Sequence, residues 1–198
     1  MVSVSILGFG NVGRQLALSF YSSDEVRLVQ VYNRSTPTPS ALPNHLFTHQ
    51  LDGLMDADVY IIAVSDRAVA ELASRLNLPD RLIVHTAGSL GYDALPESGR
   101  RGVFYPLQTF SKSKDVDFQG LPVFIETESP QDNDTLKLAA KALKARVFEI
   151  DSRQRRALHV AAVFACNFSN HMYQIADTLC KANGIPFDAL HPLILETA

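Results

Sequence analysis

The chain has 198 residues, 46% of them hydrophobic, and a net charge of −3 from 18 basic and 21 acidic residues. This is enough for one well-packed core, as one domain or as a domain with an appendage, and it argues against a disordered chain. The only basic run is Arg153–Arg156. We therefore expect no dedicated nucleic-acid surface.

The sequence indicates a cytoplasmic protein. Both cysteines, Cys166 and Cys180, fall in a predicted helical region, so reduced thiols are expected instead of a disulfide framework. Residues 1–13 lack the basic region and cleavage site of a signal peptide. Residues 159–176 carry no charge, but their His, Asn, Ser and Gln side chains would be costly in hydrocarbon. No membrane span is predicted.

Strand and helix signals alternate along the first three quarters of the chain. A strand at 2–7, a helix at 11–21 and a strand at 26–32 precede the Pro-rich loop STPTPSALP and a doubtful strand near 46–49. The later expected elements are strands at 59–64, 82–86, 103–107, 122–126 and 146–150, and helices at 66–76, 92–95 and 131–144. The pattern predicts an α/β fold: a Rossmann-like, largely parallel sheet with helices on both faces.

An all-α segment is expected after residue 151. Residues 152–183 are predicted to form one long helix with Asp151 or Ser152 as N-cap, ended by Gly184 and Pro186. A further helix starts near Phe187. We expect a dinucleotide-binding domain at 1–151 and a helical domain at 152–198. Because the chain stops inside an apolar helical pattern, LHPLILETA, we expect the helical domain to be truncated here.

The segment GFGNVG at residues 8–13 predicts a dinucleotide-binding loop. It follows a strand and opens a helix at the head of a βαβ unit, which is the context this pattern requires. Gly8 permits the tight turn, Gly10 lets the backbone approach a pyrophosphate, and Gly13 permits close helix packing. Helix N–H groups then face the phosphates. The predicted cofactor contacts are Gly8, Phe9, Gly10, Asn11, Val12 and Gly13.

The end of the second strand indicates which nucleotide is bound. An NAD site would place Asp or Glu about 20 residues beyond the glycines, but this chain has Asn33, Arg34 and Ser35 there. A guanidinium with small polar neighbours suits a 2′-phosphate, so the sequence predicts NADP(H); the alternative is a solvated arginine. Val64 and Ser65 are expected beside the ribose and nicotinamide, although Ser65 or Asp66 could also simply cap the next helix.

The segment HTAGS follows another strand and supplies a second set of candidates. Ligands of open α/β sheets gather outside the carboxyl ends of the strands. We therefore expect Ala87 and Gly88 to contact the cofactor and Ser89 to orient a substrate. His85 is interpreted as a core histidine. YPLQTFS offers Gln108 and Thr109, either as further contacts or as ordinary loop packing.

Residues 159–176 form a predicted helix with an uncharged polar stripe. At about 100° per residue, the stripe contains His159, Asn170, Gln174 and Asn167 at about 0°, 20°, 60° and 80°, with His171 at its margin. The opposite face is apolar and comprises Ala161, Phe164, Ala165, Phe168, Met172, Ile175 and Leu179.

The stripe has two interpretations. Uncharged hydrogen-bonding groups indicate burial against a cofactor, a substrate or a subunit, or a place in a helix–helix interface. His159 is the best proton donor of the set because imidazole titrates near neutrality, with Asn167 and Asn170 as orienting groups. His45 and His49 lie where no helix is predicted, and no metal site is expected.

Six segments together resemble a known family: GFGNVG, VYNRS, AVSD, HTAGS, GVFYPLQTFS and HVAAVFACNFSNHMY. They are similar to bacterial NADP oxidoreductases with a Rossmann-like domain and a helical domain of unknown function. The resemblance covers essentially the whole chain. More distantly, the layout is similar to pyrroline-5-carboxylate reductase, prephenate dehydrogenase and the β-hydroxyacid dehydrogenases. It implies a dehydrogenase-like architecture, a homodimer formed through the helical domain, and a helical domain that continues past residue 198.

The sequence departs from the β-hydroxyacid dehydrogenases at their catalytic helix. Those enzymes carry a Lys there and an Asn one turn later, whereas residues 159–176 contain no Lys. His159 and Asn167 would replace the pair at a two-turn spacing, so that mechanism does not transfer directly.

Three functions follow from these features. The first is NADP(H)-dependent hydride transfer to or from a small carbonyl, imine or hydroxy-acid substrate, with His159 as acid/base. The second is a non-catalytic NADP(H)-binding sensor or interaction module. The third, less supported, is a deazaflavin cofactor in the same groove.

Overall fold

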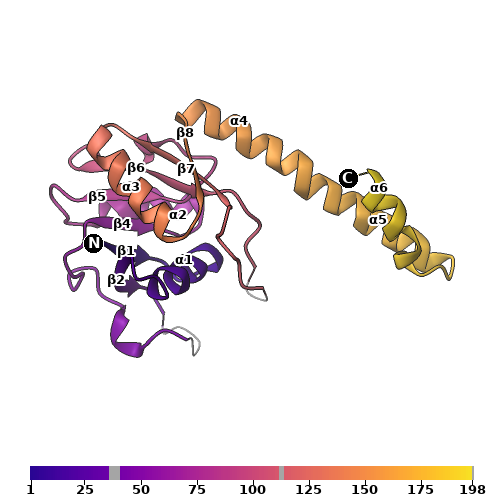
Figure 1. Ribbon diagram of the computed structural model, residues 1–198, viewed down its shortest axis with the longest axis horizontal. Coiled ribbons are helices and arrows are strands. Elements are labelled where there is room, and N and C mark those ends of the chain that lie inside the picture. The colour runs from indigo at the N-terminus through magenta and orange to yellow at the C-terminus, as the bar shows by residue number, and fades with distance from the viewer. Residues whose placement is uncertain (36–40, 112–113, 198) are drawn as a thin grey trace. The chain divides into compact units, whose positions relative to one another are not determined.

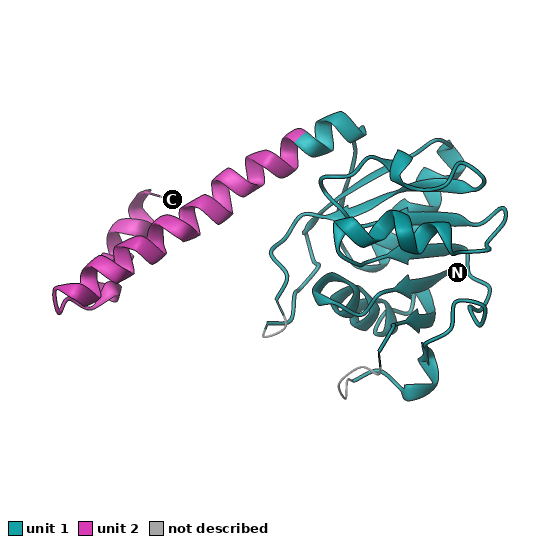
Figure 2. Ribbon diagram, turned by 180° about the vertical axis from the view of Figure 1, so that it is seen from behind, with its two compact units in different colours: residues 1–156 teal, residues 157–198 magenta. Residues whose placement is uncertain are grey.

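The computed structural model describes residues 1–35, 41–111 and 114–197. Part of the Pro-rich loop predicted after the second strand, residues 36–40, lies outside this range. The chain divides into two compact units, 1–156 and 157–198 (Figure 2). The division falls inside a helix that begins at Ser152. The functional domain boundary near residue 151 stays a prediction.

An eight-stranded sheet forms the centre of the first unit (Figure 1). Its strands are β1 Val2–Leu7, β2 Val26–Tyr32, β3 Phe47–Thr48, β4 Val59–Ile62, β5 Leu82–His85, β6 Arg100–Pro106, β7 Pro122–Thr127 and β8 Arg146–Glu149. The spatial order is β3-β2-β1-β4-β5-β6-β7-β8, and among the strand pairs of the described residues only β6–β7 is antiparallel. The predicted Rossmann-like, largely parallel sheet is confirmed. Since β1 lies between β2 and β4, the strand order reverses at β1 and β4, where such folds bind ligands.

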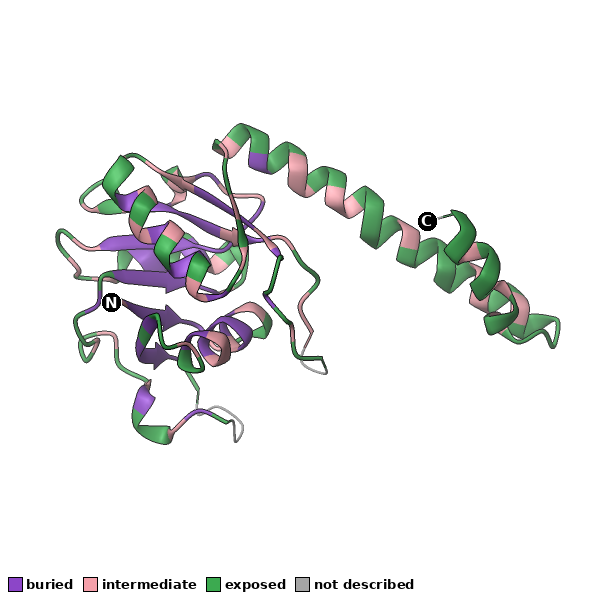
Figure 3. Ribbon diagram, in the orientation of Figure 1, coloured by how far each residue is buried: buried purple, intermediate pink, exposed green. Residues whose placement is uncertain are grey.

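Helices cover both faces of this sheet. Adjacent residues of a buried strand point to opposite faces, and Ile61 and Ile62 belong to two different hydrophobic clusters. Helices α1 (Asn11–Tyr21) and α3 (Pro130–Ala142) contribute to one cluster, and α2 (Asp66–Ser74) contributes to the other. The buried residues concentrate on the strands between these helices (Figure 3).

Charged residues explain why β6 begins earlier than predicted. It starts at Arg100 instead of Val103. Arg100 pairs with Asp132 at the start of α3, and Arg101 pairs with Glu128 at 3.0 Å. These partners let two arginines occupy strand positions that the hydrophobic pattern does not reveal. The doubtful strand near 46–49 is the two-residue β3, preceded by a 3₁₀ turn, η1 (Asn44–Leu46).

The C-terminal segment is helical. Helix α4 (Ser152–Ala162), a π-helical stretch η3 (Val163–Phe168) and α5 (Ser169–Ala182) follow without a break. A short turn η4 (Phe187–Leu190) and α6 (His191–Thr197) end the described chain. No helix within the described ranges is long and apolar enough to cross a membrane.

The predicted long helix is confirmed over nearly all of its expected residues. The prediction that it is α-helical throughout is wrong at 163–168, which are π-helical. Its start is the expected one: Asp151 Oδ1 accepts from the Gln154 N–H at 2.7 Å, and Gln154 Oε1 accepts from the Asp151 N–H at 3.0 Å. Asp151 is thus the N-cap of a capping box. A π turn contains about one more residue than an α turn. Residues beyond it are therefore rotated back about the helix axis by roughly 100°, compared with their positions in a continuous α-helix.

Candidate functional site

The glycine loop joins β1 to α1 with almost no free space. Gly8 has φ +115°, and its N–H donates to the Tyr32 carbonyl at 2.8 Å. A Cβ at Gly13 would lie 2.0 Å from the Gly8 carbonyl oxygen, whereas one at Gly10 would meet nothing within 4 Å. Gly8 and Gly13 are therefore required by the fold. Gly10 leaves an open surface at the start of α1, as a pyrophosphate site needs.

Asn11 connects this loop to the segment after β6. Its Nδ2 donates to the Phe110 carbonyl at 3.1 Å. One turn further along α1, Gln15 Nε2 donates to the Lys114 carbonyl at 3.0 Å and its Oε1 accepts from the Val116 N–H at 3.2 Å. The YPLQTFS segment thus lies beside the glycine loop. The Asn11 side chain serves this packing, which leaves its backbone N–H for a phosphate.

A cavity of about 500 Å³ lies next to the glycine loop. It brings together six of the predicted cofactor residues: Gly8, Asn33, Arg34, Ser35, Val64 and Ser65. Asn33 organises the entrance, because its Oδ1 accepts from the Phe9 N–H at 3.3 Å and its Nδ2 donates to the Ser35 carbonyl at 2.6 Å.

The other wall of this cavity comes from α2, which the sequence reasoning did not include. Arg67, Glu71 and Arg75 line it. Their four-residue spacing places them on one helical face, and that spacing was the signal available in the sequence. Ser65 is the N-cap of α2 but makes no side-chain capping bond.

The segment after β5 holds the predicted substrate residue Ser89. Its hydroxyl donates to the carboxylate of Asp66, the first residue of α2, so the ends of β4 and β5 are joined by this bond. Ala87 and Gly88 are buried beside it. Since the Ser89 proton is directed at Asp66, the lone pairs of its oxygen are the groups available to a ligand.

His85 is a core histidine, which confirms its sequence interpretation. It is fully buried. Nδ1 accepts from the Ala87 N–H at 3.2 Å, so Nε2 carries the proton and donates to the Gly91 carbonyl at 3.0 Å. Burial is the main cause that lowers the pKa of His85. A neutral imidazole therefore supports the turn that carries Gly88 and Ser89.

A buried ion pair behind this turn was also missed. Arg155, fully buried at the start of α4, pairs with Glu126 of β7 and donates to the Leu90 carbonyl. Ser152 Oγ donates to the same carboxylate at 2.7 Å and accepts from the Tyr92 N–H at 3.4 Å. The first turn of α4 is thus fixed to the segment that follows Ser89.

The predicted catalytic residues His159, Asn167 and Asn170 all lie in the second unit. His159 is half-buried and the two asparagines are exposed. The π turn alters their spacing: relative to His159, Asn170 moves from about 20° to about −80°, and His171 moves from about 120° to about 20°. The angular order predicted for the stripe is therefore wrong beyond the π turn. The catalytic roles of these residues stay predictions.

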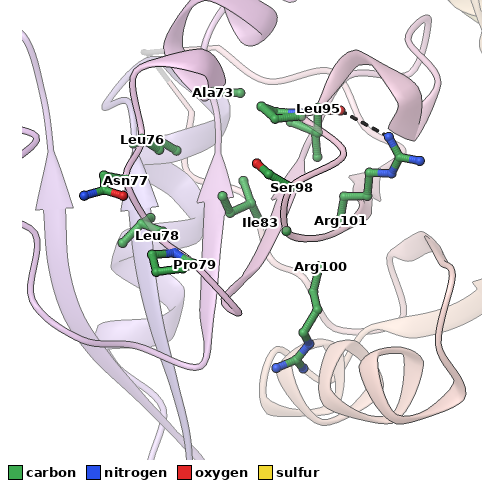
Figure 4. Close-up of a pocket in the computed structure, with 12 residues that line it drawn as sticks. Ala73, Leu76, Asn77, Leu78, Pro79, Ile83, Leu95, Ser98, Arg100 and Arg101 are labelled. Carbon is green, nitrogen blue, oxygen red and sulfur yellow. Dashed lines mark hydrogen bonds between the residues drawn. The ribbon is translucent and has the colours of Figure 1, made fainter.

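A smaller cavity of about 200 Å³ lies at the opposite edge of the sheet, at the amino ends of β5 and β6 (Figure 4). Apolar side chains including Leu76, Ile83 and Leu95 line it, and Arg100 and Arg101 lie at its rim. Arg101 donates to the Leu95 carbonyl at 3.4 Å. Because both arginines are paired with carboxylates, this cavity offers no excess positive charge to an anion.

Comparisons with known proteins agree with this arrangement. Residues 3–88 match the family described as "NADP oxidoreductase coenzyme F420-dependent", and residues 121–198 match a domain of unknown function. A search of curated proteins found no match. A "putative NADP oxidoreductase" from Bacteroides fragilis is 38% identical, with a TM-score of 0.79 over 99% of this chain and 78% of that one.

Two structures show likeness in fold alone. Pyrroline carboxylate reductase from Plasmodium falciparum, with NADP bound, is 12% identical, with a TM-score of 0.68 over 99% of this chain and 75% of that one. A reductive aminase from Aspergillus terreus, in complex with NADPH and ethyl levulinate, is 14% identical, with a TM-score of 0.70 over 99% of this chain and 72% of that one.

Proposed function

The chain belongs to the NADP oxidoreductase family of its Bacteroides fragilis relative, and we propose that it transfers a hydride between NADP(H) and a small carbonyl, imine or hydroxy-acid substrate. One observation carries the proposal. Gly10 has an open side, and a cavity of about 500 Å³ beside the same loop is lined by Gly8 and Arg34. A dinucleotide with a 2′-phosphate fits this combination of a close backbone approach and a guanidinium that forms no ion pair with the described residues.

The protein's own residues would orient the reactants and supply a proton. NADPH, when bound, supplies the hydride. We propose that Ala87 and Gly88 lie beside the nicotinamide and that Ser89, whose own proton is held by Asp66, accepts a hydrogen bond from a hydroxyl or iminium N–H of the substrate. His159 is proposed as the acid/base, with Asn167 or Asn170 orienting the substrate oxygen or nitrogen.

A non-catalytic NADP(H) sensor is the second candidate. It is favoured by one observation: residues 159–176 contain no Lys, the catalytic residue that the similar β-hydroxyacid dehydrogenases carry on this helix. Such a module would bind NADP(H) equally well, and its polar stripe would contact a partner.

We also propose that the protein forms a homodimer through its helical segment. The second unit exposes large apolar side chains, with Phe164 61%, Phe168 49% and Leu179 61% exposed. Burial of such a face in a second copy is the usual way to remove it from water. Sedimentation equilibrium tests this: Phe168→Glu should shift the protein from dimer to monomer, and a wild-type monomer would refute the proposal.

A thermal-shift comparison tests the nucleotide assignment. NADPH, NADH and a deazaflavin are each added to the wild type, to Arg34→Ala and to the control Arg27→Ala, which changes an exposed arginine on β2, the strand that precedes Arg34. Ligand at about 100 times its Kd should stabilise by about 2.7 kcal/mol. We expect stabilisation by NADPH over NADH in the wild type and the control, and loss of that difference in Arg34→Ala. No shift with either nicotinamide nucleotide would refute both candidates.

A further inference from the structure

The face of α2 opposite Arg34 carries charges that no role above explains. We propose that Arg67 and Arg75 form with Arg34 the cationic wall that distinguishes NADP(H) from NAD(H). The inference rests on the proposed function and extends it to residues outside the glycine loop and the β2 terminus. These arginines would determine cofactor specificity through the 2′-phosphate.

The helix geometry places these side chains together. Arg67 and Glu71 lie on α2 and Arg75 is its C-cap residue. The three are spaced four residues apart and so share one helical face. Leu72, beside them, is buried and fixes the helix against the sheet. All three charged residues line the cavity that also contains Arg34 and Gly8. The α2 face and the β2 terminus are therefore two walls of one site.

The described residues that line this cavity do not balance its charge. Within the described ranges, Arg34, Arg67 and Arg75 form no ion pair, whereas Arg81, Arg100 and Arg101 are each paired with a carboxylate. Glu71 is likewise outside the ion pairs of the described residues. Three guanidinium groups and one carboxylate leave an excess of two positive charges at the cavity. A phosphate monoester carries about −1.5 to −2 at neutral pH, which matches this excess.

The separation of the arginines along the helix bears on which of them can contact a phosphate directly. Eight residues of α-helix separate Arg67 from Arg75, which is about 12 Å along the axis. At this separation the two guanidinium groups reach one phosphate only if both side chains converge on it, so we assign a field effect to at least one of them. Charges interact across about 10 Å at 0.1 M salt, and a concave site focuses such a field. We assign direct contact to Arg34 and electrostatic support to the α2 arginines.

This assignment predicts different nucleotide affinities for variants that remove a charge and variants that keep it. Removing an exposed supporting charge should weaken binding of a 2′-phosphorylated nucleotide by about fivefold, and removing both by about twentyfold. Arg67→Lys and Arg75→Lys keep the charge and should stay within about twofold of the wild type. A nucleotide without the 2′-phosphate should bind equally well to every variant.

Titration calorimetry with 2′,5′-ADP and 5′-AMP tests the proposal. The proteins are the wild type, Arg67→Gln, Arg75→Gln, the double variant, the two Lys variants, and Arg27→Gln as a matched exposed arginine outside the cavity. Unfolding curves first establish that each protein is folded. We expect selective loss for 2′,5′-ADP in the Gln variants, and a wild-type preference that declines as salt is raised.

The outcomes distinguish this inference from the proposed function. Equal losses for both nucleotides, or a double variant within about twofold of the wild type for 2′,5′-ADP, would overturn the role of the α2 arginines alone. A wild type that binds neither NADPH nor NADH would overturn the proposed function itself.

Discussion

A Cβ placed on Gly13 would lie 2.0 Å from the carbonyl oxygen of Gly8. The first helix is therefore packed on the end of the first strand at a distance that only glycine allows. Gly10, between them, has no neighbour within 4 Å of such a Cβ. The same loop thus contains glycines required for folding and one whose open side is available to a ligand.

Alanine substitutions should separate these two roles. Gly13→Ala should destabilise the protein by about 2–3 kcal/mol or more, because the added methyl group overpacks the loop. Gly10→Ala has room and an ordinary φ of −78°, so its stability should stay within about 1 kcal/mol while its Kd for NADPH rises at least about tenfold. Urea unfolding and NADPH titration measure both. Normal NADPH affinity in Gly10→Ala would contradict the assignment of the phosphate site.

The buried Arg155–Glu126 pair should be a major determinant of stability. Arg155→Met leaves the Glu126 carboxylate, only 11% exposed, without its counter-ion and should cost about 3–5 kcal/mol in the free energy of unfolding. Adding Glu126→Leu should recover part of that loss, because no buried charge then remains unpaired. Chemical unfolding of the single and double variants is the measurement. A single variant as stable as the wild type would show that the pair is not buried in solution.

His85 should make the protein less stable in acid. Burial lowers the pKa of His85 in the folded state below its usual 6.5, so below about pH 6.5 the unfolded chain binds a proton that the folded chain does not. Stability should fall with decreasing pH in this window, by at most about 1.4 kcal/mol per pH unit from this group.

His85→Gln removes that titration while keeping a polar side chain at the position. The difference between wild-type and variant stability, measured by urea unfolding from pH 7.5 down to about pH 5, should therefore change with pH only below about 6.5. A constant difference across the range would show that the folded and unfolded states protonate His85 equally.

His159→Ala tests the proposed proton donor. It should lower kcat about 10²- to 10⁴-fold while the Kd for NADPH stays within about twofold. His45→Ala, an exposed histidine on η1, is the matched control and should keep full activity. Unchanged turnover in His159→Ala would remove this residue from the mechanism and leave the Asp66–Ser89 pair as the nearest alternative in the first unit.

The elements that could be predicted from the sequence are those whose limits are marked by residues within or next to them. β1, α1 and β2 were predicted to the residue, because apolar runs bounded by glycine, serine or aspartate define them within the chain itself. The π turn at 163–168 was not predictable, since this stretch has no glycine or proline to mark a change in hydrogen bonding. Its effect is nevertheless large, because every residue beyond it is rotated about the helix axis.

The candidate site was predictable where strand ends supplied it. Gly8, Arg34 and Ser65 were predicted because loops at carboxyl strand ends are the expected ligand positions, and one cavity brings all three together; their contact with a cofactor stays a prediction. The α2 arginines were missed because they lie on a helix face, which reads as ordinary solvated surface. Arg155 was missed because its partner Glu126 is 29 residues away, a contact that only the folded sheet creates.

Hydride transfer itself is tested most directly with NADPH that carries deuterium at both positions of nicotinamide C4. The protein with saturating bound NADPH is incubated with a panel of small keto acids, aldehydes and cyclic imines, and the products are analysed by mass spectrometry. We predict that at least one panel member gains one deuterium, at a rate that falls in His159→Ala. Tight NADPH binding with no deuterium transferred to any of these compounds would contradict the oxidoreductase assignment and support the sensor.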